Sequence, residues 1–214
     1  MLSKINTYKL PISIGLLMIF YIVGLLGMLF SDQPDEFAQL SWLNLLISGA
    51  VLFLNHEKWS AKLLLALVSI GILGYLVEVA GVQTGMIFGE YQYGEALGYK
   101  LGGMPLIIGL NWVMLCYFSV FTFSRWIKPW WLISSVAAMS LVGLDLIIEP
   151  VAIKLDFWTW RSEDIPIQNF IAWFLIAAVF NKLITLTKEE SSNKLAPYLF
   201  LIQTLFFLTL RITL

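Results

Sequence analysis

The sequence predicts an all-α fold: a polytopic membrane helix bundle of about seven transmembrane helices, forming a single integral-membrane domain over residues 1–214. The chain is 59% hydrophobic and only 13% charged, and its mean hydropathy is +0.84. A soluble domain of this length cannot bury so much apolar surface, so much of it must face lipid. The spacing of the apolar stretches and the distribution of basic residues support the same fold class.

A helix needs about 20 apolar residues to cross a bilayer. Apolar stretches that approach this length are separated by polar connections. The second apolar stretch is short and contains Asn44. No cleaved signal peptide is expected at the N-terminus, because Lys4 and Lys9 precede a run long enough to span, with no clear small-residue cleavage site after it. The predicted spans are 8–30, 38–54, 62–81, 103–123, 130–149, 167–187 and 195–213.

The basic residues predict the orientation, because cytoplasmic connections of membrane proteins are rich in lysine and arginine. If the chain spans seven times, nine of the thirteen basic residues fall on one side, whereas the acidic connection 31–36 falls on the other. We therefore expect an N-in, C-out topology with the long connections 82–102 and 150–166 outside. The nine residues are Lys4, Lys9, Lys58, Lys62, Arg125, Lys128, Lys182, Lys188 and Lys194.

Three acidic residues lie near the outer ends of apolar segments, where ionisable groups are costly and usually functional. Glu78 precedes Gly81 by about one turn, and Asp145 and Glu149 share a helix face at i, i+4 spacing. Pro150 is expected to end that segment. Burial and mutual repulsion should keep at least one of the three acids protonated and able to donate a proton. Ordinary solvation, or pairing with Lys100, Lys154 or Arg161, is the alternative for each acid.

Both long outer connections contain residues suited to cover these acids. The first, together with the residues that follow it, is rich in glycine and aromatic residues and predicts a compact folded or re-entrant loop rather than a flexible linker. In the second, Trp158 and Trp160 either anchor the chain at the interface or form an aromatic wall that stabilises a cation. Asn169 either caps a helix or orients a water or a carboxyl. Trp112 and Trp173 are further aromatic candidates inside helices.

Composition argues against several other classes of function. A net charge of −1 gives no indication of nucleic-acid binding, and a single cysteine excludes an internal disulfide. With one histidine, a His or Cys metal cluster is not expected, although carboxylates remain available for a hard cation. A retinal protein is disfavoured because the last segment lacks a lysine. A charge-lined transporter is disfavoured because no repeat symmetry is evident.

The motifs around the acids resemble the carotenoid biosynthesis protein family, the integral-membrane carotenoid 1,2-hydratases, over about residues 74–173. This chain differs from the family pattern at Ile87, where proline is common, and at Glu149, where aspartate is usual. The first motif comprises Glu78, Gly81, Thr84, Gly85, Phe88, Gly89, Tyr91, Tyr93, Leu97, Gly98, Lys100, Leu101, Gly103, Pro105 and Trp112. The second comprises Asp145, Glu149, Pro150, Trp158, Trp160, Pro166, Asn169, Phe170 and Trp173.

The resemblance implies addition of water to a terminal isopropylidene double bond of an acyclic carotenoid end group, of γ-carotene, lycopene or C50 type, without a cofactor. Asp145 is then the expected proton donor, while Glu149 and Glu78 orient water and stabilise charge. Expected partners are the carotenoid, the lipid bilayer and other carotenoid enzymes, in a bacterial or archaeal plasma membrane. The alternatives are an end-group cyclase or isomerase, or a non-enzymatic carrier or transporter. The residues expected to line the substrate site are Tyr91, Tyr93, Trp112, Trp158, Trp160, Asn169 and Trp173.

Overall fold

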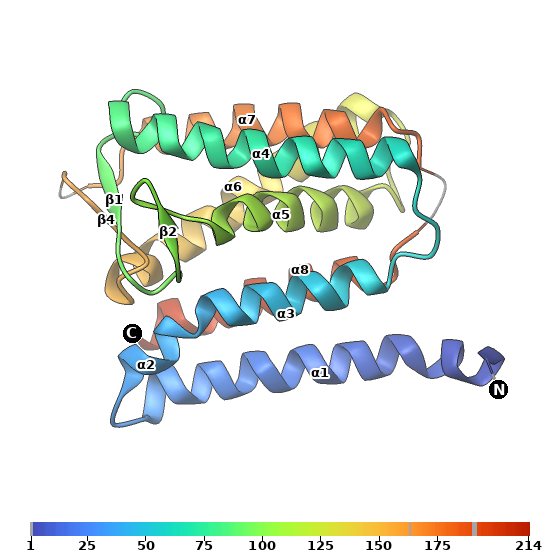
Figure 1. The fold of residues 1–214 in the computed structure, drawn as a ribbon, viewed down its shortest axis with the longest axis horizontal. Helices are drawn as coiled ribbons and strands as arrows, with labels where there is room; N and C mark the ends of the chain where they lie inside the picture. Colours follow the sequence, from blue (N-terminus) through green and yellow to red (C-terminus); the bar gives the residue numbers. More distant parts are fainter. Residues whose placement is uncertain (1, 163, 190–191) are drawn as a thin grey trace.

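The computed structural model describes residues 2–162, 164–189 and 192–214, with side chains from residue 8 onward. It is an α-helical bundle (Figure 1), so the predicted fold class is confirmed. Within these described ranges, six stretches, counting α2 and α3 as one, are long and apolar enough to cross a membrane, and the chain is a multi-pass membrane protein. The helices are α1 (Leu2–Phe30), α2 (Pro34–Gln39), α3 (Ser41–Leu54), α4 (Ala61–Thr84), α5 (Ile107–Phe123), α6 (Trp130–Lys154), α7 (Ile167–Thr185) and α8 (Ala196–Thr213).

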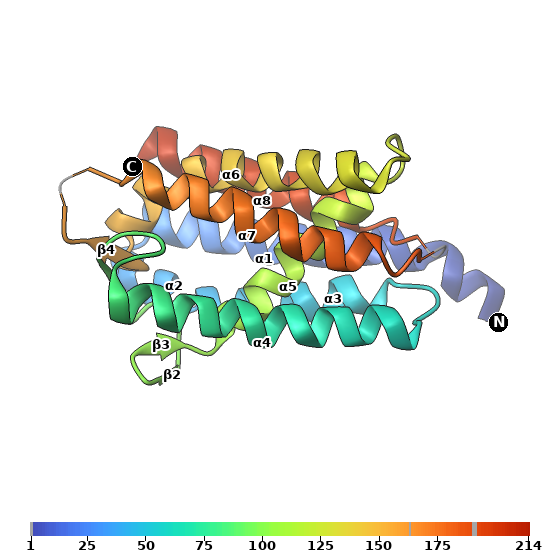
Figure 2. The ribbon, with the colours of Figure 1, turned by 90° about the horizontal axis from the view of Figure 1, so that it is seen from above.

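Helix α5 lies at the centre of the bundle (Figures 1 and 2), where α3, α4, α6, α7 and α8 all pack against it. Most of its side chains are buried, including Trp112 and Tyr117. Helix α1 lies at the edge and packs against α2, α3 and α8. At 17 residues, α5 is shorter than the six stretches that are long enough to span, and it is the helix most surrounded by protein.

The connections alternate between the two ends of the bundle, as the predicted spans require. The loops before α2, after α4 and after α6 gather at one end, together with the C-terminus, and the N-terminus lies at the other end (Figure 1). We call the end where these loops gather the site end. That the site end faces outward remains a prediction from the basic residues.

Pro150 does not end its helix, so the predicted boundary at residue 149 is wrong. Helix α6 continues through the proline to Lys154. Proline has no N–H to donate to the carbonyl of Leu146, one turn earlier. The Arg211 side chain from α8 donates to that carbonyl instead, with an Nη1–O distance of 2.6 Å. The freed backbone acceptor is thus satisfied by a neighbouring helix, which is how proline is tolerated inside membrane helices.

Two other predicted boundaries also shift. The second predicted span begins earlier than residue 38 and is broken at Leu40, between α2 and α3. The fourth begins four residues later than residue 103, because Met104–Pro105 form strand β3, which pairs antiparallel with β2 (Lys100–Leu101).

The glycine-rich connection folds compactly over the site end, although not every apolar residue in it is buried. Gly85 ends α4 in the left-handed conformation, with φ of 65°, and Phe88 and Leu97 behind it are buried. Leu101, in contrast, is 56% exposed. The connection also contains strand β1 (Tyr91–Tyr93), which pairs with β4 (Trp158–Trp160) from the other long connection.

Candidate active site

A two-stranded antiparallel sheet joins the two long connections at the site end. Its register places Tyr91 opposite Trp160 and Tyr93 opposite Trp158. Because side chains alternate along a strand, these four aromatic residues share one face of the sheet. That face looks into the bundle, toward the three acids, and its aromatic residues donate hydrogen bonds to two of them.

Glu78, from α4, accepts hydrogen bonds from three neutral donors. Tyr91 and Tyr93 both donate to Oε2, the second at 2.9 Å, and the Trp112 indole donates to Oε1 at 3.1 Å. Burial, reinforced by the Glu78 carboxylate, raises the pKa of both tyrosines far above its ordinary value of 10.0. The two phenols therefore stay protonated and hold Glu78 as hydrogen-bond donors.

Glu149, from α6, accepts from three donors as well. The indoles of Trp158 and Trp160 donate to its Oε2 at 3.0 and 2.8 Å. The amide of Asn169, near the start of α7, donates to its Oε1 at 3.2 Å. Strand β4 and helix α7 thus hold this carboxyl from two sides.

Asp145 has far fewer partners than the other two acids. The same Asn169 amide nitrogen donates to Asp145 Oδ2 at 3.0 Å, so it bridges Asp145 and Glu149. Among the described residues, no other hydrogen bond reaches the Asp145 carboxyl. Asp145 is nevertheless only 2% exposed, and it lines the same cavity as the other two acids.

No cation compensates the three acids within the described part of the chain. The basic residues considered as partners bind elsewhere: Lys100 pairs with Glu95, and Arg161 pairs with Glu90. Lys154 donates to the backbone carbonyl of Leu214. Three buried carboxyls with no positive charge beside them cannot all be ionised at reasonable cost. At least one of the three is therefore favoured to stay protonated.

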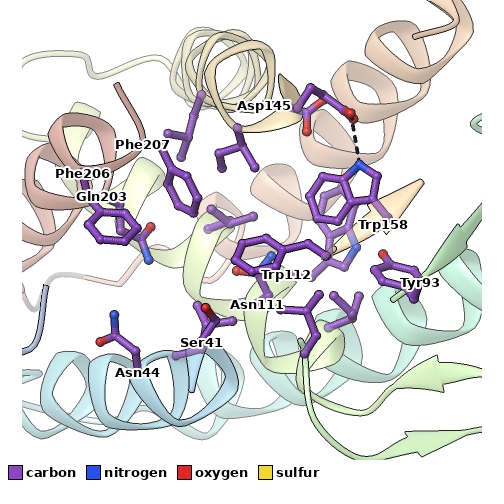
Figure 3. Close-up of a pocket in the computed structure, with 18 of the residues that line it drawn as sticks. Ser41, Asn44, Tyr93, Asn111, Trp112, Asp145, Trp158, Gln203, Phe206 and Phe207 are labelled. Carbon is purple, nitrogen blue, oxygen red and sulfur yellow. Dashed lines mark hydrogen bonds between the residues drawn. The ribbon is translucent and has the colours of Figure 1, made fainter. Parts of the chain in front are cut away.

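A cavity of about 260 Å³ opens beside the acids. The ring of Trp112 lies across its centre (Figure 3) and stacks on Trp173, with centroids 4.5 Å apart. The cavity lies just below the roughly 300–1,000 Å³ typical of small-molecule sites. It therefore has room for one end of a long lipid rather than for a whole carotenoid.

All the residues proposed for the site from the sequence line this one cavity: Glu78, Tyr91, Tyr93, Trp112, Asp145, Glu149, Trp158, Trp160, Asn169 and Trp173. Within the described ranges, no group of three or more His, Cys, Asp or Glu side chains is arranged to hold a metal ion. The arrangement supplies a shielded acid, two carboxyls held by neutral donors, and π faces beside them. These are the elements needed to protonate an apolar double bond and stabilise the resulting cation.

Sequence reasoning missed the part of the cavity that extends away from the acids between α1, α3 and α8. Polar side chains line it together with apolar ones such as Phe20 and Phe206. A polar residue inside an apolar segment is a usable signal, and Asn44 lies inside the second predicted span. The missed polar residues are Tyr21, Ser41, Asn44, Asn111 and Gln203.

Gly74 was missed as well, although it sets the position of Trp112. A Cβ added at Gly74 would lie 2.8–2.9 Å from three atoms of the Trp112 side chain. Real Cβ atoms essentially never make contacts this short. Only glycine lets α4 approach the indole closely enough for Trp112 to reach Glu78.

Comparison with known proteins gives a family match. Residues 40–214 match the family described as "Carotenoid biosynthesis protein". The bisanhydrobacterioruberin hydratase of Haloarcula japonica is 30% identical over a match of 128 residues, and the match covers 54% of this chain and 42% of that protein. The chain thus spans about two fifths of the length of this curated relative. No solved structure matches the chain.

Proposed function

The chain belongs to the carotenoid biosynthesis protein family, and from that premise we propose that it adds water to a terminal isopropylidene double bond of an acyclic carotenoid, giving a tertiary alcohol. The observation that carries the proposal is that the three buried acids accept different numbers of hydrogen bonds. Glu78 and Glu149 each accept three hydrogen bonds from neutral donors, whereas Asp145 accepts one.

Asp145 is the proposed proton donor. Hydrogen bonds donated to a carboxyl favour its ionised form, so the acid with the fewest donors is best suited to carry the proton. Its Oδ1 receives no hydrogen bond from the described residues. In the proposed first step, the Asp145 proton moves to the CH carbon of the double bond. The π electrons form the new C–H bond, leaving a tertiary cation on the carbon that bears the methyl groups.

Water then attacks this cation. Glu149 holds and orients the water, and it takes the proton that the attacking water releases as the C–O bond forms. The proton returns to Asp145 by way of solvent, so that the net reaction consumes only water. Glu149 is suited to this role because Asn169 holds it beside Asp145 through one shared amide nitrogen.

The cation is stabilised by charge and by π faces. Glu78 is held as an acceptor by Tyr91, Tyr93 and Trp112, and supplies negative charge beside the cavity. Trp112 and Trp173 present stacked indole rings, which attract cations through their faces. The polyene of the substrate leaves the cavity between α1 and α3, where the lining residues Val23 and Leu40 are more than half exposed.

A relative that is named a bisanhydrobacterioruberin hydratase supports water addition as the reaction. We further propose a bacterial or archaeal plasma membrane as the location, with the site end outside.

Expression in a lycopene-producing host, with the pigments analysed by mass spectrometry, tests the proposal. The expected product is heavier than lycopene by one water, or by two waters if both ends react. An unchanged mass with an altered retention time would instead indicate cyclisation or isomerisation. Unchanged lycopene that co-purifies with the protein would indicate a carrier. Asp145→Asn serves as the matched inactive control, because it keeps the size of the side chain and removes the acid.

A further inference from the structure

The site end carries a second cavity, of about 570 Å³, beside the β1–β4 sheet. Gln92 and Thr159 lie opposite each other in the sheet and line this cavity. Because side chains alternate along a strand, both point to the face of the sheet that is turned away from the acids. Most of the other lining side chains are polar too, among them Gln83 and Thr84 from the last turn of α4. We call this second cavity the polar cleft.

The polar cleft is open to water. Gln83 and Gln92 are exposed, and within the described part of the chain their side chains hydrogen-bond to no protein group, so water satisfies them. Glu90 and Arg161 form an ion pair at its edge, with an Nη1–Oε2 distance of 2.5 Å. Both side chains are mostly exposed, at 60% and 81%. An exposed ion pair is weak and screened by solvent, so this pair does not seal the cleft.

Two residues, Tyr91 and Trp160, line both the polar cleft and the cavity that holds the acids. Their rings are tilted by 40° with centroids 5.1 Å apart, and both residues are partly exposed. On the side of the acids, Tyr91 donates to Glu78 and Trp160 donates to Glu149. The two cavities therefore adjoin at the same two residues that bond the buried carboxyls.

The proposed reaction needs water after the carotenoid end group has entered the cavity. The opening between α1 and α3 is lined by apolar side chains such as Val23 and Leu40, and the polyene occupies it in the proposed complex. Water that used this opening would have to pass an apolar passage already filled by substrate. The polar cleft offers a separate, aqueous side, and it adjoins the cavity beside Glu149, the carboxyl proposed to hold the water.

We propose that the polar cleft is the water entrance of the site, and that water passes from it between Tyr91 and Trp160 to Glu149 while the carotenoid occupies the cavity. This inference rests on the proposed function and deepens it, because it gives the second substrate an entrance of its own. The carotenoid enters from the bilayer between α1 and α3, and water enters from the opposite side, across the β1–β4 sheet.

A separate water entrance decides the fate of the tertiary cation. When water reaches the cation, the C–O bond forms and the product is the alcohol. When water is kept out, a carbon next to the cationic centre loses a proton to Glu149, and the electrons of that C–H bond form a new double bond. The proton gained by Glu149 then offsets the one lost by Asp145, and the product is an alkene of unchanged mass.

A removable label in the polar cleft tests the proposal. Cys116, the one cysteine of the chain, is fully buried, so an introduced cysteine can be labelled alone. The Gln92→Cys protein is labelled in detergent with a bulky, charged methanethiosulfonate, reconstituted in liposomes and given lycopene. We expect the label to lower alcohol formation by about tenfold and to raise the share of the isomer of unchanged mass. Reduction of the mixed disulfide should restore alcohol formation.

Three controls separate blockage of the cleft from damage to the fold. A methylthio label on the same cysteine leaves most of the cleft open, and should lower alcohol formation much less than the bulky label. Tyr99→Cys places the bulky label at a residue that is 76% exposed and lines neither cavity, where it should change neither product. Gln83→Cys carries the same label into the cleft from α4, so the test does not depend on the folding of one variant.

Each outcome supports or overturns the water entrance. Undiminished alcohol formation by the labelled Gln92→Cys and Gln83→Cys proteins would overturn it, because water would then enter elsewhere. Equal loss of alcohol and isomer would overturn it as well, because the label would then disturb the acids rather than the water supply. Absence of hydration by the unlabelled wild type would instead overturn the proposed function, and the water entrance with it.

Discussion

Trp160 lies directly opposite Tyr91 across the two-stranded β1–β4 sheet, and the centroids of their rings are 5.1 Å apart. The two residues donate to different acids: Tyr91 to Glu78, and Trp160 to Glu149. The sheet therefore fixes two carboxyls from separate helices against one rigid aromatic surface. Neither connection could hold both acids alone, so the pairing of the two loops is a structural requirement of the site.

Trp160→Phe tests whether the indole donor matters beyond the ring. The substitution keeps aromatic packing against Tyr91 and removes the N–H that bonds Glu149. Because hydrogen bonds to charged groups contribute about 1.5–3 kcal/mol, we expect the hydration rate to fall roughly ten- to a hundredfold. The measurement is the initial rate in liposomes. Thr159→Val, whose side chain points to the other face of the sheet, should retain activity. Equal losses in both variants would contradict the role assigned to the indole.

Gly74→Ala should displace Trp112 from Glu78. The added Cβ would lie within 3 Å of the indole, whereas a Cβ at Gly143 of α6 would meet nothing within 4 Å. We therefore expect Gly74→Ala to lower both thermal stability and activity, and Gly143→Ala to be neutral, or stabilising by up to about 1 kcal/mol because alanine favours helix. Thermal unfolding in detergent and the hydration rate give the two measurements. A Gly74→Ala protein as active as Gly143→Ala would show that the close approach is not needed.

Arg211 should stabilise α6 only because Pro150 is present. Arg211→Leu removes the donor to the Leu146 carbonyl, and leaving that acceptor unpaired should cost about 1–3 kcal/mol of unfolding free energy. Pro150→Ala restores a backbone N–H for the same carbonyl. The cost of Arg211→Leu should then become much smaller in the Pro150→Ala background. Unfolding midpoints of the four proteins complete this cycle. Equal costs in both backgrounds would exclude the proposed compensation.

His56, at the end opposite the site, should make the fold sensitive to acid. Its ring bonds the Tyr117 hydroxyl at 2.7 Å and the Lys58 carbonyl at 2.8 Å, and burial lowers its pKa below the ordinary value of 6.5. The folded protein therefore binds a proton less readily than the unfolded chain. The stability that neutral His56 contributes is therefore fully present above pH 6.5, and it should be lost as the pH falls below that value and through the lower pKa of the folded state.

Unfolding midpoints between pH 8 and pH 5 test this expectation. The midpoint of the wild type should begin to fall once the pH is below the ordinary pKa of histidine, about 6.5, and should continue to fall toward pH 5. The His56→Gln protein should start less stable but lose much less over the same range, because glutamine does not titrate. Parallel curves for the two proteins would assign the acid sensitivity to other groups.

Much of the site could be predicted because buried charge is costly. Glu78, Asp145 and Glu149 stood out in apolar segments, and the spacing of basic residues placed them near one end of the bundle. The structure brings all three to one cavity. The helix count and fold class followed from hydropathy for the same reason, because lipid admits few alternatives to the helix.

Features that depend on tertiary partners could not be predicted. The helix through Pro150 depends on Arg211, which lies 61 positions further along the chain. Strands β1 and β4 are only three residues long, so their alternating Tyr-x-Tyr and Trp-x-Trp patterns gave little signal without knowledge that they meet. The contact between Tyr21 and Gln203 joins the first and last helices, and nothing in either segment alone indicates it.

In the proposed mechanism, Asp145 protonates a terminal double bond and water completes the addition. The most direct measurement is the mass of the pigment formed from lycopene by the purified protein in water labelled with heavy oxygen. With the wild type we expect a product that gains one labelled water per reacting end. With Asp145→Asn we expect a rate about a hundred- to ten-thousandfold lower. A product of unchanged mass, or full incorporation of labelled oxygen by Asp145→Asn, would contradict this mechanism.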